Sequence, residues 1–141
     1  MELYIRIKDG KPFEHPIFGD NFRQAFPEVD VNDLPPEFAR FERIERPLIS
    51  VYEVYEGVTY EWFSGIVKDV HHVRLMTSEE KAAKQQATKD AWALGPNYQS
   101  WTFDEEQCAY TSPIPYPEDG KLYRWDEEII SWVEVLGGNI E

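Results

Sequence analysis

A tandem repeat in the C-terminal third constrains the fold of this chain more than any other feature. Residues 101–110 (WTFDEEQCAY) match residues 123–132 (YRWDEEIISW) at an offset of 22 residues. In both copies aromatic residues occupy the first, third and last places, and the sequence Asp-Glu-Glu follows the third place. Internal similarity at a fixed offset indicates that the two copies fold in the same way.

Each copy has the pattern of a β-hairpin. Alternate residues of a strand share one face, so the first and third aromatic residues of a copy lie on the same side. Asp-Glu-Glu suits the turn, because an Asp side chain can accept a hydrogen bond from the backbone two residues further on. The last aromatic residue then returns as a cross-strand partner. This pattern gives six candidate interaction residues: Trp101, Phe103, Tyr110, Tyr123, Trp125 and Trp132.

Two interpretations of these aromatic residues are open. A module of about 40 residues buries little apolar surface, so large rings are needed to close its core. Alternatively, the rings form a platform for a sugar or a Pro-rich peptide. We favour the core interpretation. Residues 112–120 (SPIPYPEDG), between the copies, are expected to form an extended link that proline stiffens.

The module that holds the repeat is strongly acidic. Residues 96–141 contain ten acidic and two basic residues, a net charge of −8 out of −13 for the whole chain. Phosphate repels such a protein, so direct nucleic-acid binding is disfavoured. The charge suits a basic protein partner or mimicry of DNA, but we favour a soluble acidic surface over mimicry.

Residues 77–95 are expected to form a helix that connects this module to the rest. Thr77 and Glu80 match a capping box, in which each side chain bonds to the backbone amide of the other residue. Gly95-Pro96 ends the helix. Because its apolar residues are mostly alanine, the helix is expected to bury little. The predicted domains are therefore a β-rich domain of residues 1–76, the connector helix 77–95 and the acidic tandem-hairpin module 96–141.

The N-terminal residues predict another hairpin. Residues 3–8 alternate apolar and polar in part, and Asp9-Gly10 favours a tight turn because Gly accepts positive φ. Residues 11–17 then return as a second strand, and the two prolines of this strand place it at a sheet edge.

Residues 18–47 are expected to hold two short helices. Asp20-Asn21 can cap the first, which Pro27 ends, and Asp33 can cap the second over residues 37–43. Four phenylalanines at helical spacing are expected in the core: Phe22, Phe26, Phe38 and Phe41.

Residues 48–76 predict an antiparallel meander. Strands are expected over residues 49–55, 58–63 and 66–76, which are rich in β-branched and aromatic residues and are separated by Glu56-Gly57 and Ser64-Gly65. The predicted fold class is α+β and β-rich: an N-terminal antiparallel meander with short helices, one connector helix and a C-terminal tandem of aromatic β-hairpins.

The sequence contains no motif of an enzyme. It has no Gly-rich phosphate loop, no His-Glu-x-x-His pair and no nucleophile elbow. We therefore predict no catalytic residue, no cofactor and no metal. His71 and His72 come nearest to a metal pair, with Asp69 and His15 as further ligands. Adjacent strand residues point to opposite faces, however, and make poor joint ligands.

The remaining candidates have simpler explanations. The acidic pairs Glu105-Glu106 and Glu127-Glu128 could hold a hard cation, but solvated turns account for them. Cys108, the single cysteine, excludes an intramolecular disulfide and is expected to fill a small apolar slot. The sequence predicts no signal peptide and no membrane span, and we expect synthesis in a reducing cytoplasm.

The pattern of the repeat and of several N-terminal segments resembles one group of proteins. The segments are the frame from Trp101 to Trp132 with its Pro-rich link, residues 10–17 (GKPFEHPI) with 34–38 (LPPEF), and residues 52–54 with 73–81. Together they resemble small proteins of tailed phages, most closely those of myoviruses that infect marine cyanobacteria. The run MTSEEK at residues 76–81 is similar to one in tail-fibre and tail-fibre-assembly proteins.

The resemblance implies a virion structural protein, either a minor tail, a fibre-associated or a capsid-decorating component. Such a protein would be made in the host cytoplasm and would bind other virion proteins of the tail, fibre or capsid. A tail-fibre assembly chaperone is an alternative, and the acidic charge leaves open a DNA mimic or host-directed inhibitor. Homo-oligomerisation is also left open. The family has no catalytic residues to carry over.

Overall fold

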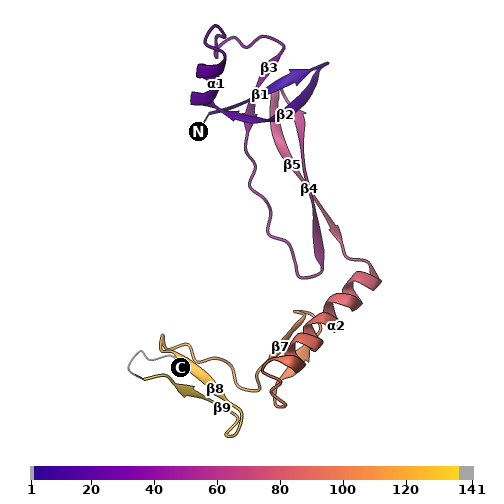
Figure 1. Ribbon diagram of the computed structural model, residues 1–141, viewed down its shortest axis with the longest axis vertical. Coiled ribbons are helices and arrows are strands. Elements are labelled where there is room, and N and C mark those ends of the chain that lie inside the picture. The colour runs from indigo at the N-terminus through magenta and orange to yellow at the C-terminus, as the bar shows by residue number, and fades with distance from the viewer. Residues whose placement is uncertain (1, 137–141) are drawn as a thin grey trace. The chain divides into compact units, whose positions relative to one another are not determined.

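The structure, a computed structural model, describes residues 2–136 and contains two compact units, Met1–Leu75 and Met76–Glu141. It is α+β and strand-rich, which confirms the predicted fold class. Each unit has its own strands and helix (Figure 1). The unit boundary lies one residue from the predicted end of the N-terminal domain. The helix that was expected as a separate connector belongs to the C-terminal unit.

The N-terminal unit is built on a five-stranded sheet with the strand order β2-β1-β3-β5-β4. Neighbouring strands are antiparallel except β3 and β5, which are parallel. This parallel pair was not expected from the sequence. The strands are β1 (Leu3–Lys8), β2 (Lys11–Phe18), β3 (Phe38–Glu42), β4 (Glu53–Phe63) and β5 (Ile66–Leu75).

Two tight turns of this sheet lie where the sequence predicts them. Asp9 and Gly10 join β1 to β2 with φ of 54° and 75°, and Ser64 and Gly65 join β4 to β5 with φ of 51° and 83°. Two successive residues with positive φ match the right-handed twist of the strands that they connect. Strand β2 is an edge strand, as its prolines predict.

Gly65→Ala is expected to lower the free energy of unfolding by about 1 kcal/mol, because an L side chain rarely adopts positive φ. An added Cβ would meet no atom within 4 Å, so the loss of stability would come from the backbone conformation and not from a steric clash. Urea unfolding followed by circular dichroism would measure it. Ser64→Asn, at the preceding left-handed position, should be neutral or stabilising. An equal loss in both variants would contradict this account.

The main core of the N-terminal unit lies on one face of the sheet. The register places Ile5 opposite Ala39 and Phe41 beside Val67, and all four side chains are buried. The ring of Tyr60, from β4, packs edge-to-face on Phe41 with centroids 5.3 Å apart. Through this contact the edge strand β4 adds a side chain to the core formed by β1, β3 and β5.

The two edge strands of the sheet approach each other around this core. The indole Nε1 of Trp62 in β4 donates a hydrogen bond to the carbonyl oxygen of Gly10, 2.9 Å away. His15 of β2 lies 3.0 Å from the Tyr60 hydroxyl through its Nδ1. Side-chain contacts therefore link the two edges of the sheet, although β2 and β4 are not paired as neighbouring strands.

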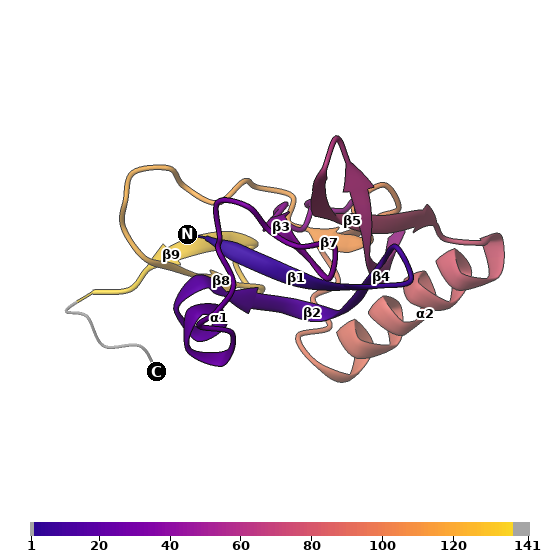
Figure 2. The same cartoon turned by 90° about the horizontal axis from the view of Figure 1, so that it is seen from above.

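A second core lies on the opposite face, beneath helix α1 (Gly19–Ala25). The ring of Phe22 stacks on Tyr4 with centroids 4.6 Å apart, and Phe26 and Phe38 pack against it. Figure 2 shows α1 beside β1 and β2. The helix ends before Pro27, as predicted, but its N-cap residue is Phe18, which makes no side-chain cap. The expected Asp20-Asn21 cap is therefore wrong.

The predicted helix over residues 37–43 is also wrong, because this segment forms strand β3. Phe38 and Phe41 are three residues apart, which suits a helix face. On a strand the same spacing sends them to opposite faces, where Phe38 joins the core under α1 and Phe41 the main core. Pairing with two neighbouring strands outweighs local propensity here.

The predicted three-stranded meander over residues 48–76 is a long two-stranded hairpin. Glu56-Gly57 is not a turn: β4 continues through it, with a bulge between Tyr55 and Gly57. Gly57 has φ of 123°, and a glycine with positive φ serves a bulge as well as a turn. Residues 43–52 form no strand and run beside the hairpin (Figure 1).

The C-terminal unit combines one helix with the two predicted hairpins. Its elements are α2 (Ser78–Leu94), β6 (Thr102–Asp104), β7 (Ala109–Thr111), β8 (Tyr123–Asp126) and β9 (Ser131–Glu134). The capping box is confirmed: the Glu80 amide donates to Thr77 Oγ1 at 3.1 Å, and the Thr77 amide donates to Glu80 Oε1 at 2.9 Å. No side chain of α2 is fully buried, as expected from its alanines.

Candidate interaction site

The two copies of the repeat form hairpins with the same register. Phe103 lies opposite Tyr110 in β6 and β7, and Trp125 lies opposite Trp132 in β8 and β9. Both pairs join the third and last aromatic residues of a copy. Both pack edge-to-face, with ring centroids 5.3 and 5.1 Å apart. The sequence repeat is therefore also a structural repeat.

The two turns are built alike. Asp104 Oδ1 accepts hydrogen bonds from the amides of Glu106 and Gln107, and Asp126 Oδ1 accepts one from the amide of Glu128. This confirms the predicted role of the aspartates. The last turn residue of each copy, Cys108 or Ile130, has φ near 50°. The left-handed residue closes the four-residue loop between the paired strands.

The six predicted aromatic residues meet in one connected cluster of rings. Trp101 lies at its centre, edge-to-face against Trp125 at 5.5 Å and against Trp132 at 6.0 Å. Trp101 thereby joins the first hairpin to the second. Three rings that the sequence interpretation missed also belong to the cluster: Trp92, Tyr98 and Tyr116. Trp92 is the single aromatic residue of the otherwise polar helix α2, and this feature of the sequence could have identified it as a packing residue.

Helix α2 packs on the first hairpin through one turn of its C-terminal half. Trp92 stacks on Tyr110 with centroids 4.4 Å apart and planes 8° from parallel. Lys89 lies with its Nζ 4.8 Å from the centroid of Phe103. Thr88 Oγ1 lies 3.4 Å from the sulfur of Cys108, which fills the buried slot expected of it. Figures 1 and 2 both show β7 along α2.

Tyr116 in the proline-rich link covers the second hairpin. Its ring packs on Trp132 at 4.9 Å and on Tyr123 at 5.7 Å. The Tyr123 amide donates to the Tyr116 hydroxyl at 2.9 Å, and the Tyr123 hydroxyl donates to Asp119. This bond to a carboxylate raises the pKa of Tyr123 to about 12. The link is therefore part of the packed unit.

Glu127 ties the second hairpin to the segment before the first. Its Oε1 accepts from the Ser100 hydroxyl at 2.7 Å and from Trp125 Nε1 at 2.8 Å, and its Oε2 accepts from the Ser100 amide at 3.0 Å. Hydrogen bonds to a carboxylate favour the charged form. The bonds from Ser100 and then Trp125 therefore lower the pKa of Glu127 below its ordinary value of 4.5.

Glu127→Gln is expected to destabilise the C-terminal unit at neutral pH, with an effect that shrinks in acid. A lowered folded-state pKa contributes stability above the ordinary pKa, and that stability is lost as the pH falls through the folded value. The difference in unfolding free energy between wild type and variant should therefore be largest at pH 6–7. It should decline as the pH falls below about 4.5. Urea titrations at several pH values would measure it.

The matched control for this charge change is Glu128→Gln, next in the same turn. The Glu128 side chain is exposed, and only its amide takes part in the turn. An equal pH-dependent loss in both variants would show that net charge, not the bonds from Ser100 and Trp125, stabilises the turn.

The rings of the six predicted residues contact one another and the rings of Trp92, Tyr98 and Tyr116. Trp125 is buried, and the other five are half-buried. This packing supports the core interpretation of the aromatic repeat, and their role in binding a partner stays a prediction. The large apolar side chains that the unit exposes are others: Leu94, Ile114, Tyr116, Leu122, Ile129, Ile130 and Leu136.

The weak metal site suggested by the histidines does not assemble. Asp69 is buried and accepts from Arg43 Nη1 at 3.0 Å and from the Ile44 amide at 2.9 Å. His71 Nε2 lies 2.7 Å from the Ile44 carbonyl, which can only accept, so Nε2 carries the proton. Its Nδ1 then accepts from the Tyr55 hydroxyl at 2.7 Å. Asp69 and His71 together hold the segment after β3 against β5.

The other two histidines lie apart from this network. His72 Nε2 contacts Thr59 Oγ1 at 2.8 Å, on the opposite face of β5 from His71, and His15 contacts Tyr60. Within residues 2–136, no three His, Cys, Asp or Glu side chains are grouped as metal ligands would be. The acidic pairs Glu105-Glu106 and Glu127-Glu128 belong to no such group in this part of the chain.

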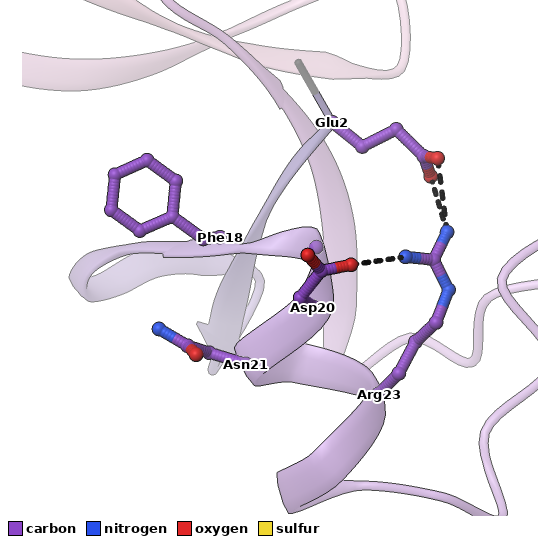
Figure 3. A pocket seen from close by; sticks show the side chains of 6 residues that line it. Glu2, Phe18, Asp20, Asn21 and Arg23 are labelled. Carbon is purple, nitrogen blue, oxygen red and sulfur yellow. Dashed lines mark hydrogen bonds and ion pairs between the residues drawn. The ribbon is translucent and has the colours of Figure 1, made fainter.

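The N-terminal unit has a shallow hollow of about 310 Å³ beside the start of α1. Figure 3 shows Arg23 between Glu2 and Asp20, with Phe18 and Asn21 pointing away from these ion pairs. Arg23 Nη2 lies 2.9 Å from both carboxylate oxygens of Glu2, and Nη1 lies 3.6 Å from Asp20. Arg23 therefore balances only one of the two carboxylates, Glu2 and Asp20, that line this hollow.

A search for membrane spans and three comparisons with known proteins complete the description of the chain. No helix in the described part of the chain has the length and apolar character needed to cross a membrane. A scan against models of protein families gives no match, and searches of curated proteins and of solved structures find no protein that matches the chain.

Proposed function

We propose that this protein is a structural component of a phage virion, a minor tail, fibre-associated or capsid-decorating protein, and that it acts by docking onto other virion proteins. The resemblance of the repeat and of the N-terminal segments to small phage proteins supports the phage context. The observation that carries the docking role is the exposure of large apolar side chains on strands and turns of both units.

In the N-terminal unit two of these exposed side chains lie at the end of the edge strand β4. Trp62 and Phe63 precede the turn to β5 and are 43% and 46% exposed, although aromatic rings of this size are usually buried. An edge strand also offers backbone groups to a partner strand. Apolar anchors beside a free edge are what docking by strand addition requires.

Mass spectrometry of purified particles tests the proposal. The protein should co-purify with virions through a density gradient at a fixed ratio to the major structural proteins. A phage enzyme that is abundant in infected cells serves as the control for trapped host-cell contents. Absence of the protein from gradient-purified particles would overturn the proposal.

The same experiment separates the alternatives. A tail-fibre assembly chaperone that leaves would be present in infected cells and absent from particles, and its co-expression would rescue an insoluble fibre protein. A DNA mimic or host-directed inhibitor would instead be recovered with a basic host protein, in a complex that dissociates as salt rises.

A further inference from the structure

The tip of the second hairpin exposes two adjacent isoleucines. Ile129 is 62% and Ile130 is 47% exposed. The first hairpin has Gln107 and Cys108 at the equivalent places, one polar and one buried at 8% exposure. The repeat thus provides an internal comparison, in which Cys108 of one tip packs against Thr88 of α2 and the equivalent Ile130 of the other tip is exposed to solvent.

Ile130 also adopts a backbone conformation that suits it poorly. Its φ is 50°, in the left-handed region, and a β-branched residue there is a genuine outlier. Glycine and asparagine occupy this region readily. An isoleucine that is both strained and half exposed does not serve the stability of its own hairpin. Local strain of this kind gathers at binding sites, where the surroundings hold it in place.

The neighbouring side chains hold this tip in a fixed conformation. Glu127 is fastened to Ser100 and Trp125, and the Asp126 carboxylate accepts from the Glu128 amide. A rigid anchor loses less conformational entropy on binding than a flexible one. The tip is therefore preorganised to present its isoleucines.

The charge around the tip indicates the kind of surface that it fits. The tip follows three consecutive acidic residues, and residues 96–141 have only Lys121 and Arg124 as basic residues. Glu128 is exposed, so its carboxylate is available to a partner. Complementary charge favours a partner with basic groups around an apolar depression.

We propose that Ile129 and Ile130 are the anchor of a docking site that inserts into an apolar socket, ringed by Lys and Arg side chains, on another virion protein. This inference rests on the proposed virion role and names the surface through which that role is carried out. It assigns a specific function to the tip that the aromatic cluster beneath it supports.

Site-specific photo-crosslinking in assembled particles tests the inference directly. A photoreactive amino acid at position 129 should join the protein to one virion protein after irradiation of purified particles. Position 107 is the matched control, because it is the same place in the first hairpin. Equal crosslinking from both positions, or none from 129 in particles that contain the protein, would overturn the inference. If the protein were missing from particles, the virion role itself would fail.

Crosslinking also distinguishes a different virion protein from a second copy of this chain as the binding partner. A product formed with a second copy of this chain would replace the proposed partner by self-association, and would overturn the inference as stated. The crosslinked peptide of the partner should contain Lys or Arg beside apolar residues.

Substitutions provide a second readout. In particles whose only source of the protein is the variant, Ile129→Ser with Ile130→Asn should lower its copy number at least tenfold, while its thermal unfolding midpoint stays equal or rises. Leu136→Ser, at another exposed apolar residue of the unit, should leave the copy number unchanged. An equal loss in both variants would contradict a specific role of the tip.

Glu128→Lys tests the charge of the partner surface. If the socket is ringed by basic groups, this variant should also lower the copy number, with its folded structure retained by circular dichroism. An unchanged copy number would contradict the proposal that Lys and Arg side chains ring the socket, because a reversed charge at a close complementary contact lowers affinity.

Discussion

Trp101→Ala is expected to lower the free energy of unfolding of the C-terminal unit by about 3–5 kcal/mol, the range for removing a large aromatic side chain from a core. Trp101 contacts four other rings, and among the described residues it alone links the rings near α2 with those of the second hairpin. A small unit has little stability to lose. Far-UV circular dichroism during urea unfolding should therefore show this unit largely unfolded in mild denaturant.

Two conservative variants test whether the ring contacts are the cause. The Nε1 of Trp101 is buried and has no hydrogen-bond partner among the described residues, so Trp101→Phe removes an unsatisfied group and should cost about 1 kcal/mol or less. Trp125→Phe removes the bond to Glu127 and should cost more. The reverse order, or an alanine variant as stable as wild type, would contradict the central position of Trp101.

Asp69→Ala is expected to destabilise the N-terminal unit by about 2 kcal/mol. The Asp69 side chain is fully buried and accepts from Arg43 and from the Ile44 amide, which would lose its acceptor. The side chain of Arg43 is 52% exposed, so its guanidinium can return to water. The cost is therefore below the 3–5 kcal/mol of a pair that is buried on both sides. Urea unfolding of wild type and variant would measure it.

Glu42→Ala is the control for this second prediction. Glu42 lies 3.0 Å from Lys68 in an ion pair on the same strands, but its side chain is 54% exposed. Such surface pairs contribute about 0–1 kcal/mol. If Glu42→Ala cost as much as Asp69→Ala, burial of the Asp69 carboxylate would not be the source of its effect.

The features that could be predicted from the sequence are those fixed by a few neighbouring residues. Asp9-Gly10 and Ser64-Gly65 form turns, Thr77 and Glu80 form the capping box, and Asp104 closes its turn, because each depends on local backbone chemistry. The hairpins of the repeat followed from alternation over ten residues. These elements carry the candidate site, which is why the cross-strand pairs Phe103–Tyr110 and Trp125–Trp132 could be predicted.

The errors arose where distant parts of the chain decide the structure. Residues 38–42 form a strand because β1 and β5 lie on either side, and sequence spacing does not reveal that β3 and β5 are parallel. Gly57 permits either a turn or a bulge, and the pairing of β4 with residues 66–75 selects the bulge. Trp92 was overlooked because its helix is polar overall, and its place in the core depends on the fold of the hairpin.

The burial of Cys108 beneath α2 gives the protein a built-in probe of its own motion. As the single cysteine, it confines any thiol chemistry to one place, between the first hairpin and Thr88. A thiol reagent can reach the sulfur only when the helix lifts from the hairpin. The rate of labelling under native conditions therefore reports the equilibrium of that local opening. Because Cys108 is native, this opening can be measured without an engineered cysteine, in solution or on an assembled particle.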